Sequence, residues 1–201
     1  DEEGSMHVND TYQENVTELP PPDFDGMPWE KYFSPETLVP YLGTRGCYWG
    51  KCTFCDHGAG YIDQFRAKHA EQIVDELEYL KNKLNAKHFM FTDESFPPAL
   101  FIKLPPMMVE RDLGIYWTTL IRFESQLLDP KLWDMAHKSG CRSLYYGLES
   151  ANERIIKLVK KDTDIEAAKI NLEQAKRVGI WSHVMCFYGF PSETPEEAED
   201  T

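Results

Sequence analysis

Five strand-like apolar segments alternate with helical segments along this chain of 201 residues. The strand-like segments cover residues 38–42, 87–92, 115–121, 143–147 and 180–188. This alternation predicts an α/β fold, in which a sheet of parallel strands is connected by right-handed helical crossovers. Pro40 suits an edge position for the first strand, because proline has no N–H to donate to a neighbour. A doubly wound sheet and a partial barrel both satisfy the pattern.

The helical segments carry recognisable end signals. Residues 69–85 repeat apolar side chains at helical spacing. Residues 129–140 begin with an Asp–Pro pair and end in glycine, and residues 164–178 are followed by a glycine. Residues 97–111 form a weaker helix, which we expect two adjacent prolines to interrupt. A further helix begins at residue 194 with a capping Thr and acidic residues in its first turn.

The acidity of the chain is concentrated at its two ends. The formal net charge is −13, from 34 acidic and 21 basic residues, yet residues 1–30 and 192–201 contain no Lys or Arg. Acidic and proline-rich, residues 1–36 are predicted to form a linker or N-terminal extension. Residues 37–201 are predicted to form the folded core. We expect this core to be incomplete at its C-terminus, because the sequence stops just as a helix begins.

Composition and patterning exclude several classes of protein. The sequence has no run of 18 apolar residues, so no membrane-spanning helix is predicted. The excess of acid argues against a duplex-binding protein, which needs a basic face, and nucleic-acid binding is not indicated. Lys157, Lys160 and Lys161 are interpreted as a solvated helix end. With no signal peptide in the sequence, a cytoplasmic location is expected.

Three of the five cysteines, Cys47, Cys52 and Cys55, lie within nine residues after the first predicted strand. The odd number of cysteines and the absence of a secretion signal disfavour a disulfide framework. Closely spaced thiolates favour zinc or an iron–sulfur cluster. A structural zinc site needs four protein ligands, and His57 can supply the fourth. A cluster with an open position predicts instead that polar residues follow the later strands.

Polar or glycine-rich residues do follow the later predicted strands. Since the carboxyl ends of parallel strands meet at one edge of the sheet, these residues are expected to lie near the cysteine loop. Carboxylates there can bind an amine or ribose hydroxyls, and an arginine can bind a carboxylate. The residues in chain order are Thr92, Asp93, Glu94 and Ser95, then Arg122 and Glu124, then Gly147, Glu149 and Ser150, then Gly189 and Pro191.

The cysteine loop, with Phe54 inside it, resembles the cluster loop of radical S-adenosylmethionine (SAM) enzymes. The resemblance extends over about residues 38–201 through TDES, YYGLESANERIIKLVKK and FYGFPSETPEE, in the order expected for the family. The segment before the loop is similar to the cobalamin-binding subgroup, in which a linker joins an upstream cobalamin domain to the barrel. The resemblance implies a partial (β/α)6 barrel similar to a TIM barrel, truncated here after about five strands.

This resemblance implies the cofactors and the reaction. The three cysteines would hold a [4Fe–4S] cluster whose fourth iron binds SAM. Reductive cleavage of SAM would give a 5′-deoxyadenosyl radical, with the electron coming from a donor such as flavodoxin or ferredoxin. Cobalamin-dependent methyl transfer or a related C–H modification would follow, with cobalamin bound by a domain outside this chain. The substrate stays open.

The resemblance also implies the SAM-binding residues but assigns no catalytic residue. Phe54 would pack near the adenine, and the Gly189–Pro191 turn would line the adenine site. Residues 92–95 would hold the methionine amino group. Arg122 would pair with the methionine carboxylate, and Glu149 and Ser150 would contact the ribose or the methionine end.

Two features depart from the usual family pattern. The cysteine spacing is C-x4-C-x2-C where C-x3-C-x2-C is common, and Gly50 is expected to absorb the additional residue. The usual Gly-Gly-Glu after the second strand is absent. Two other functions stay open alongside the main hypothesis: a radical SAM methylthiotransferase and a non-catalytic α/β module stabilised by zinc.

Overall fold

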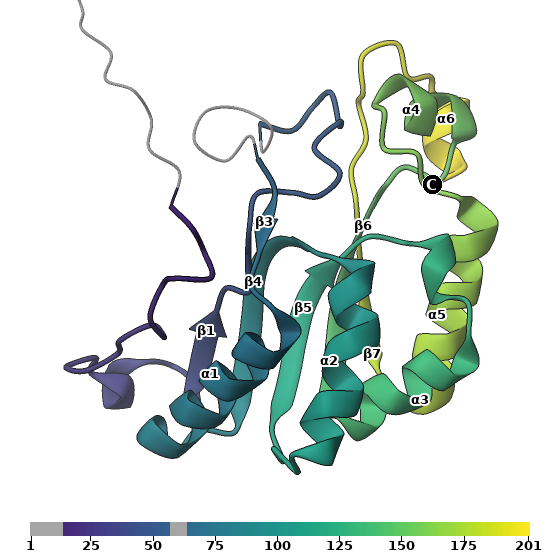
Figure 1. Ribbon diagram of the computed structural model, residues 1–201. Helices are drawn as coiled ribbons and strands as arrows, with labels where there is room; N and C mark the ends of the chain where they lie inside the picture. Colours follow the sequence, from purple (N-terminus) through teal and green to yellow (C-terminus); the bar gives the residue numbers. More distant parts are fainter. Residues whose placement is uncertain (1–13, 57–63) are drawn as a thin grey trace, which may run out of the picture.

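The computed structural model describes residues 14–56 and 64–201, and its main sheet is parallel throughout (Figure 1). The five strands occur in the order β1-β4-β5-β6-β7. Their bounds are β1 Leu38–Tyr41, β4 His88–Phe96, β5 Tyr116–Ile121, β6 Cys141–Glu149 and β7 Trp181–Cys186. All four strand pairs are parallel, as the alternation predicts. β1, which contains Pro40, is an edge strand, so that prediction is confirmed.

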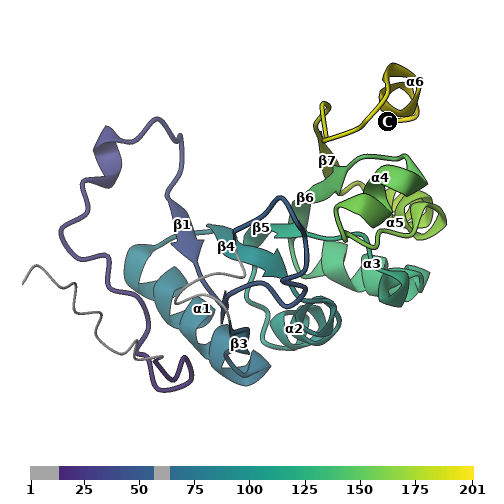
Figure 2. The same cartoon turned by 90° about the horizontal axis from the view of Figure 1, so that it is seen from above.

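The long helices lie together on one side of this sheet (Figure 2). They are α1 Ala70–Leu84, α2 Pro98–Glu110, α3 Pro130–Lys138 and α5 Ile165–Val178. A doubly wound sheet carries helices on both faces, whereas a barrel carries them only outside. The arrangement therefore corresponds to a partial barrel, and the described residues do not close it.

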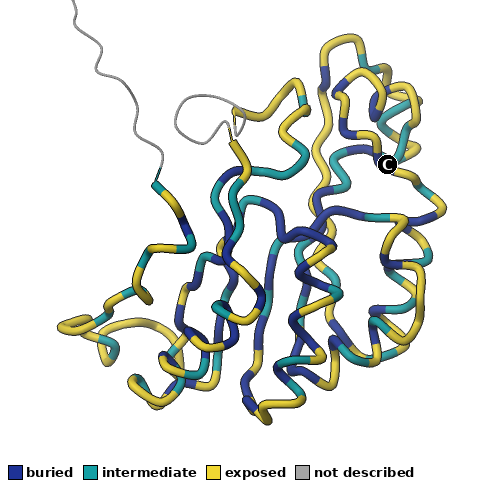
Figure 3. The backbone as a smooth tube through the Cα atoms, viewed as in Figure 1, coloured by how far each residue is buried: buried dark blue, intermediate teal, exposed yellow. Residues whose placement is uncertain are grey.

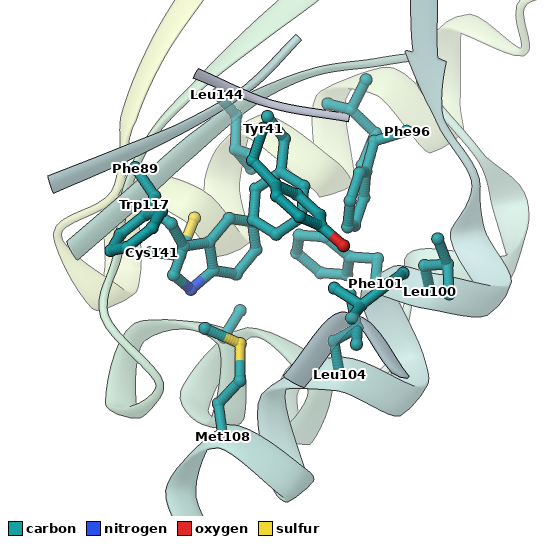
Figure 4. Packing of buried hydrophobic residues seen from close by; sticks show 14 of the residues in the cluster. Tyr41, Phe89, Phe96, Leu100, Phe101, Leu104, Met108, Trp117, Cys141 and Leu144 are labelled. Carbon is teal, nitrogen blue, oxygen red and sulfur yellow. The ribbon is translucent and has the colours of Figure 1, made fainter. Parts of the chain in front are cut away.

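The hydrophobic core fills the layer between the sheet and these helices (Figure 4). Phe89 and Phe91 from β4 and Trp117 from β5 face Phe101 of α2 and Trp133 of α3, and none is more than 2% exposed. In Figure 3 the buried stretches accordingly run along the central strands and the sheet-facing sides of the helices. Residues 17–36, which contain the short 3-10 helix η1 Trp29–Lys31, are largely exposed beside this core.

The predicted break in α2 is wrong, because the helix continues through Pro105 and Pro106. Each proline removes one backbone hydrogen bond from the helix. Burial of Leu100, Leu104 and Met108 against the core offsets this loss, since tertiary packing supplies most of a helix's stability.

Two strands extend beyond their predicted ends. β4 continues through residues 92–95, which the sequence places after the strand, and its register with β5 shifts between Phe91 and Phe96. β6 likewise continues through Glu149. Residues 92–95 and Glu149 therefore occupy the last positions of their strands, where alternate side chains point to opposite faces of the sheet.

Of the short elements, only α6 was predicted. β2 Thr44–Arg45 and β3 Arg66–Ala67 pair antiparallel on either side of the cysteine segment. α4 Glu153–Leu158 is capped by Asn152, whose side chain accepts from two backbone N–H groups. η3 Ser125–Leu127 precedes α3, and α6 Pro195–Glu199 has the predicted Thr194 cap. Among the described residues, no helix combines the length and the apolar character needed to cross a membrane.

Candidate functional site

A cavity of about 140 Å³ lies at the carboxyl ends of β4, β5 and β6. The cysteine loop closes one side of it, and side chains from the strand ends form the other side. The predicted site residues that line the cavity are Cys47, Cys52, Phe54, Cys55, Glu94, Ser95, Arg122 and Glu149. Residues from the loop and from three strands are thus brought together at the expected edge of the sheet.

All three loop cysteines are free thiols, and they are at least partly accessible. Burial raises the pKa of Cys52, while the positive charges of Lys161 and Arg122 act in the opposite direction. Within residues 14–56 and 64–201, no three Cys, His, Asp or Glu side chains are close enough together to ligate one metal ion. The chemistry of the donor set nevertheless fits an iron–sulfur cluster, since three free thiols face one cavity. His57, the candidate fourth zinc ligand, lies outside the described residues.

Two ion pairs organise the charged side of the cavity. Arg122 Nε lies 3.1 Å from Glu124 Oε1, and Arg122 Nη2 donates to the carbonyl of Lys161 at 2.8 Å. The ammonium of Lys161 lies 2.9 Å from Glu149 Oε1. A side chain at Gly147 would collide with this second pair, because its Cβ would lie 2.6 Å from Glu149 Oε1 and 2.8 Å from Lys161 Nζ. The absence of a side chain at Gly147 therefore leaves room for the Glu149–Lys161 pair.

Three buried polar atoms of cavity-lining residues have no hydrogen-bond partner among the described residues: Glu94 Oε2, Ser95 Oγ and Arg122 Nη1. Two of them carry opposite charges, since Glu94 Oε2 is a carboxylate acceptor and Arg122 Nη1 a guanidinium donor. Buried polar atoms are rarely left unpaired in folded proteins. A ligand with an amino and a carboxylate group would satisfy Glu94 Oε2 and Arg122 Nη1, because a carboxylate accepts from guanidinium and an amine donates to carboxylate.

Other predicted site residues lie close to the cavity without lining it. Thr92 donates its hydroxyl to the carbonyl of Tyr41, and Asp93 accepts from the hydroxyl of Thr44 at 2.5 Å. The buried Ser150 accepts from the backbone N–H of Asn152. These three side chains therefore stabilise the surrounding backbone in this structure.

The Gly189–Pro191 turn lies beside the aromatic ring of Phe54. The backbone N–H groups of Gly189 and Phe190 both donate to Glu193 Oε2. The ring of Phe190 packs 6.0 Å from that of Phe54, and Phe187 packs 5.3 Å from it. The predicted adenine-binding residues are thus neighbours in the structure.

Sequence reasoning missed one charged cavity residue. Lys161 was interpreted as part of a solvated helix end, yet it is 8% exposed and paired with Glu149. The partner, Glu149, lies at the end of β6, and a sequence pattern cannot show that this strand end meets the α4–α5 connection, which contains Lys161. Tyr145 and Met185 also line the cavity, from β6 and β7.

The sequence profile of the Radical SAM superfamily matches residues 41–201. Among curated proteins, the chain is 28% identical over 193 residues to an uncharacterized methyltransferase of Pyrococcus horikoshii, covering 94% of this chain and 41% of that protein. It is 30% identical over 188 residues to the anaerobic magnesium-protoporphyrin IX monomethyl ester cyclase of Rubrivivax gelatinosus, covering 90% and 33%. It is also 30% identical over 197 residues to the bacteriochlorophyllide d C-12(1)-methyltransferase of Chlorobaculum tepidum, covering 92% and 41%. The chain thus spans well under half the length of these relatives.

Solved structures share the fold. The apo form of the cobalamin-dependent SAM radical enzyme OxsB superposes with a TM-score of 0.80 at 21% identity, covering 100% of this chain and 30% of that one. The radical SAM methyltransferase TsrM of Kitasatospora setae, solved with cobalamin and a [4Fe–4S] cluster, gives a TM-score of 0.70 at 21% identity, covering 81% and 33%. Because the family profile covers most of the chain and the fold agrees, this chain belongs to the radical SAM superfamily of enzymes.

Proposed function

We propose that residues 37–201 are the cluster- and SAM-binding core of a radical SAM methyltransferase and that residues 1–36 are a linker. One observation carries this proposal: three free thiols share a cavity with an unpartnered carboxylate oxygen and an unpartnered guanidinium nitrogen. A redox metal centre and a zwitterionic ligand together would use all of these groups. The family and its methyltransferase relatives support the same reading.

In this proposal Cys47, Cys52 and Cys55 hold a [4Fe–4S] cluster. Bound in this way, the cluster would supply the electron for reductive cleavage of SAM to methionine and a 5′-deoxyadenosyl radical. The residues of the chain position SAM for that step. Arg122 binds the methionine carboxylate through Nη1, and Glu94 accepts from the amino group through Oε2.

The remaining side chains orient the nucleoside end of SAM. Lys161 holds the carboxylate of Glu149 at the cavity wall, where it can accept from ribose hydroxyls. Phe54, with Phe187 and Phe190 packed beside it, supplies the aromatic face for adenine. Ser150 and residues 92–93 support the strand ends on which these groups lie.

We propose cobalamin-dependent methyl transfer as the overall reaction, with cobalamin held by a part of the protein outside this chain. The methyltransferase names among the relatives and the cobalamin in the OxsB and TsrM structures support it. A cyclisation is a second candidate, because two relatives are named magnesium-protoporphyrin IX monomethyl ester cyclases. The electron donor would be a flavodoxin or ferredoxin, which suits a reducing, cytoplasmic location.

Anaerobic reconstitution with iron and sulfide tests the cluster. We expect a brown protein with about four irons and four sulfides per chain, as one [4Fe–4S] cluster requires. Cys52→Ala should lose the colour and the iron. Cys186→Ser is the matched control, since Cys186 is an exposed free cysteine at the end of β7 and should leave iron content unchanged.

SAM binding and metal identity are measured on the same preparations. Arg122→Gln should keep its iron and bind SAM about tenfold more weakly, because a charge-assisted hydrogen bond is lost. A colourless protein with one zinc would contradict the proposal, and loss of that zinc in His57→Ala would establish the zinc-stabilised module instead. Release of 5′-deoxyadenosine from SAM only in the presence of reductant would support the radical reaction.

A further inference from the structure

Residues 159–161 present three consecutive backbone carbonyls toward the cysteine loop and Arg122. Val159 O accepts from the backbone N–H of Thr53 at 3.0 Å. Lys160 O accepts from the indole N–H of Trp49 at 2.9 Å, and Lys161 O accepts from Arg122 Nη2 at 2.8 Å. We call residues 159–161 the carbonyl platform.

The carbonyl platform exists because α4 ends immediately before it. The platform residues follow the last helical residue, Leu158, so their carbonyls accept no hydrogen bond within the helix and are available to other donors. Lys160 adopts a φ of 53° and Asp162 a φ of 57°, which turn the chain sharply after the helix. Left-handed backbone at non-glycine residues is uncommon, and contacts on both sides of the turn hold it in place.

Trp49 connects the cysteine loop to this platform and to Arg122. Besides its N–H bond to Lys160 O, its ring lies 4.3 Å from the guanidinium carbon of Arg122. The ammonium of Lys51 lies 4.6 Å from the centre of the same ring. The indole therefore makes a directional hydrogen bond and cation–π contacts at once.

The neighbours of Trp49 complete the anchoring of the loop. Tyr48 donates its hydroxyl to Glu124 Oε1 at 2.6 Å, the same oxygen that pairs with Arg122 Nε. Gly50 follows with a φ of 60°, a conformation that glycine adopts without strain, and the chain then turns back toward Cys52. Both side chains between Cys47 and Gly50 are thus tied to residues that surround the cavity.

We propose that Trp49 is a positioning residue that holds the Cys47–Cys52 segment in place. The C-x4-C spacing gives this segment one residue more than the common family pattern, and the indole anchor prevents the longer segment from moving freely. Because the same indole packs on Arg122, it also holds the guanidinium proposed to bind SAM. The purpose of this anchoring rests on the proposed cluster function, but the anchoring itself can be measured without a cluster.

The first experiment measures loop opening in the metal-free 201-residue chain. Trypsin cleavage after Lys51, mapped by mass spectrometry, reports how often the segment leaves the platform. Trp49→Phe removes the N–H donor and keeps a ring over Arg122, so cleavage should be about fivefold faster. Trp49→Ala removes both contacts, so cleavage should be about twentyfold faster.

Two controls separate anchoring from other effects. Trp181→Phe changes a tryptophan that is 74% exposed, and it should cleave after Lys51 at the wild-type rate. Each variant is also cleaved after unfolding in urea. The cleavage rate of the folded protein is divided by this unfolded rate, so that a direct effect of residue 49 on trypsin is removed. Circular dichroism and urea unfolding check that the global free energy of unfolding is nearly unchanged.

The second experiment measures the rate at which a chelator removes iron from the reconstituted protein. We expect Trp49→Ala to release iron fastest, with Trp49→Phe intermediate and Trp181→Phe equal to wild type.

Normalised cleavage of Trp49→Ala at the wild-type rate would overturn the anchor. Faster cleavage with unchanged iron release would overturn the role in cluster positioning. Wild-type protein that binds zinc in place of iron would contradict the proposed function, while the cleavage result would still decide the anchor.

Discussion

The two faces of the parallel sheet differ in the kind of groups that they bury. On the helix-facing side the large aromatic side chains are buried, and both core indoles are paired: Trp133 Nε1 donates to Leu127 O and Trp117 Nε1 donates to Ser139 Oγ, while Tyr146 Oη has no partner among the described residues. At the cavity, charged groups are partly buried, and Glu94 and Arg122 each retain an unpartnered atom. Stability is thus concentrated on the helix-facing side, and the capacity to bind a ligand on the other.

The backbone near the cavity contains several strained positions. Three of the six positive φ angles outside the glycines occur there, at Glu149, Lys160 and Asp162, and the other three among the described residues are at Asn85, Asp112 and Ser192. Such conformations persist where surrounding contacts hold them, and they are frequent at functional sites. Substitutions on the two faces should therefore differ in whether they alter global stability or the site.

The largest effect is expected from the helix-facing core. Trp133 is fully buried, and its ring packs 5.4 Å from that of Phe101. Trp133→Ala should lower the free energy of unfolding by about 3–5 kcal/mol, because it leaves a cavity and removes the indole hydrogen bond to Leu127 O. Urea unfolding followed by circular dichroism measures this loss.

The exposed Trp181 is the matched control for this prediction. Trp181→Ala should change stability by no more than about 0.5 kcal/mol, since its side chain has little contact to lose. Equal losses for the two tryptophan variants would show that the helix-facing side is not the main source of stability. The comparison between the two faces would then fail.

The second prediction concerns the ion pair at the cavity. Glu149 and Lys161 have side chains only 13% and 9% exposed, so neither charge is well solvated. Lys161→Met should lower stability by about 3 kcal/mol, because it leaves the carboxylate buried without its partner. Urea unfolding at neutral pH measures the change.

A double variant distinguishes a lost attraction from an uncompensated charge. Glu149→Gln combined with Lys161→Met removes both charges and should regain most of the stability lost in Lys161→Met. The double variant should bind SAM more weakly than wild type even though its stability is regained, since Glu149 is proposed to contact ribose. If the double variant is no more stable than Lys161→Met, the stability lost in Lys161→Met does not come from leaving the charge of Glu149 uncompensated.

Much of the fold could be predicted from sequence, because local patterns determine it. Strand and helix periodicity, the Asp129 cap and the edge proline in β1 were each read correctly from neighbouring residues. The continuous α2 could not be predicted, since its stability depends on burial against the core. β2 and β3 consist of two residues each, too few for any periodic signal.

The site was predictable only in outline. The cysteine spacing identified one wall of the cavity, and the polar strand ends identified the other. The sequence could not show which residues of TDES face the cavity, because β4 continues through them and Asp93 binds Thr44 on the preceding segment. Lys161 was missed since its partner Glu149 lies on a different element.

The smallest effect is expected from Asp93, which lies next to Glu94 in β4 but is bound to the segment that leads into the cysteine loop. Burial raises the pKa of Asp93 to about 6, although hydrogen bonds from Thr44 and Gly43 act to lower it. Between the pKa of the unfolded chain, near 3.8, and this value, the folded state binds more protons than the unfolded state. The contribution of Asp93 to stability is therefore greatest at low pH and decreases as pH rises toward 6 and above.

Asp93→Asn, which does not titrate, isolates this contribution. The stability of wild type relative to Asp93→Asn should fall by about 1 kcal/mol between pH 5 and pH 7, as measured by urea unfolding at each pH. A constant difference across this range would mean that Asp93 is not buried as a titrating group. Iron release should be compared in the same variants at pH 7, because Asp93 holds Thr44, three residues before Cys47. If Asp93→Asn alters the free energy of unfolding but not the rate of iron release, Asp93 belongs with the stabilising face of the sheet. If it alters both quantities, the two faces are coupled through the strand end that they share.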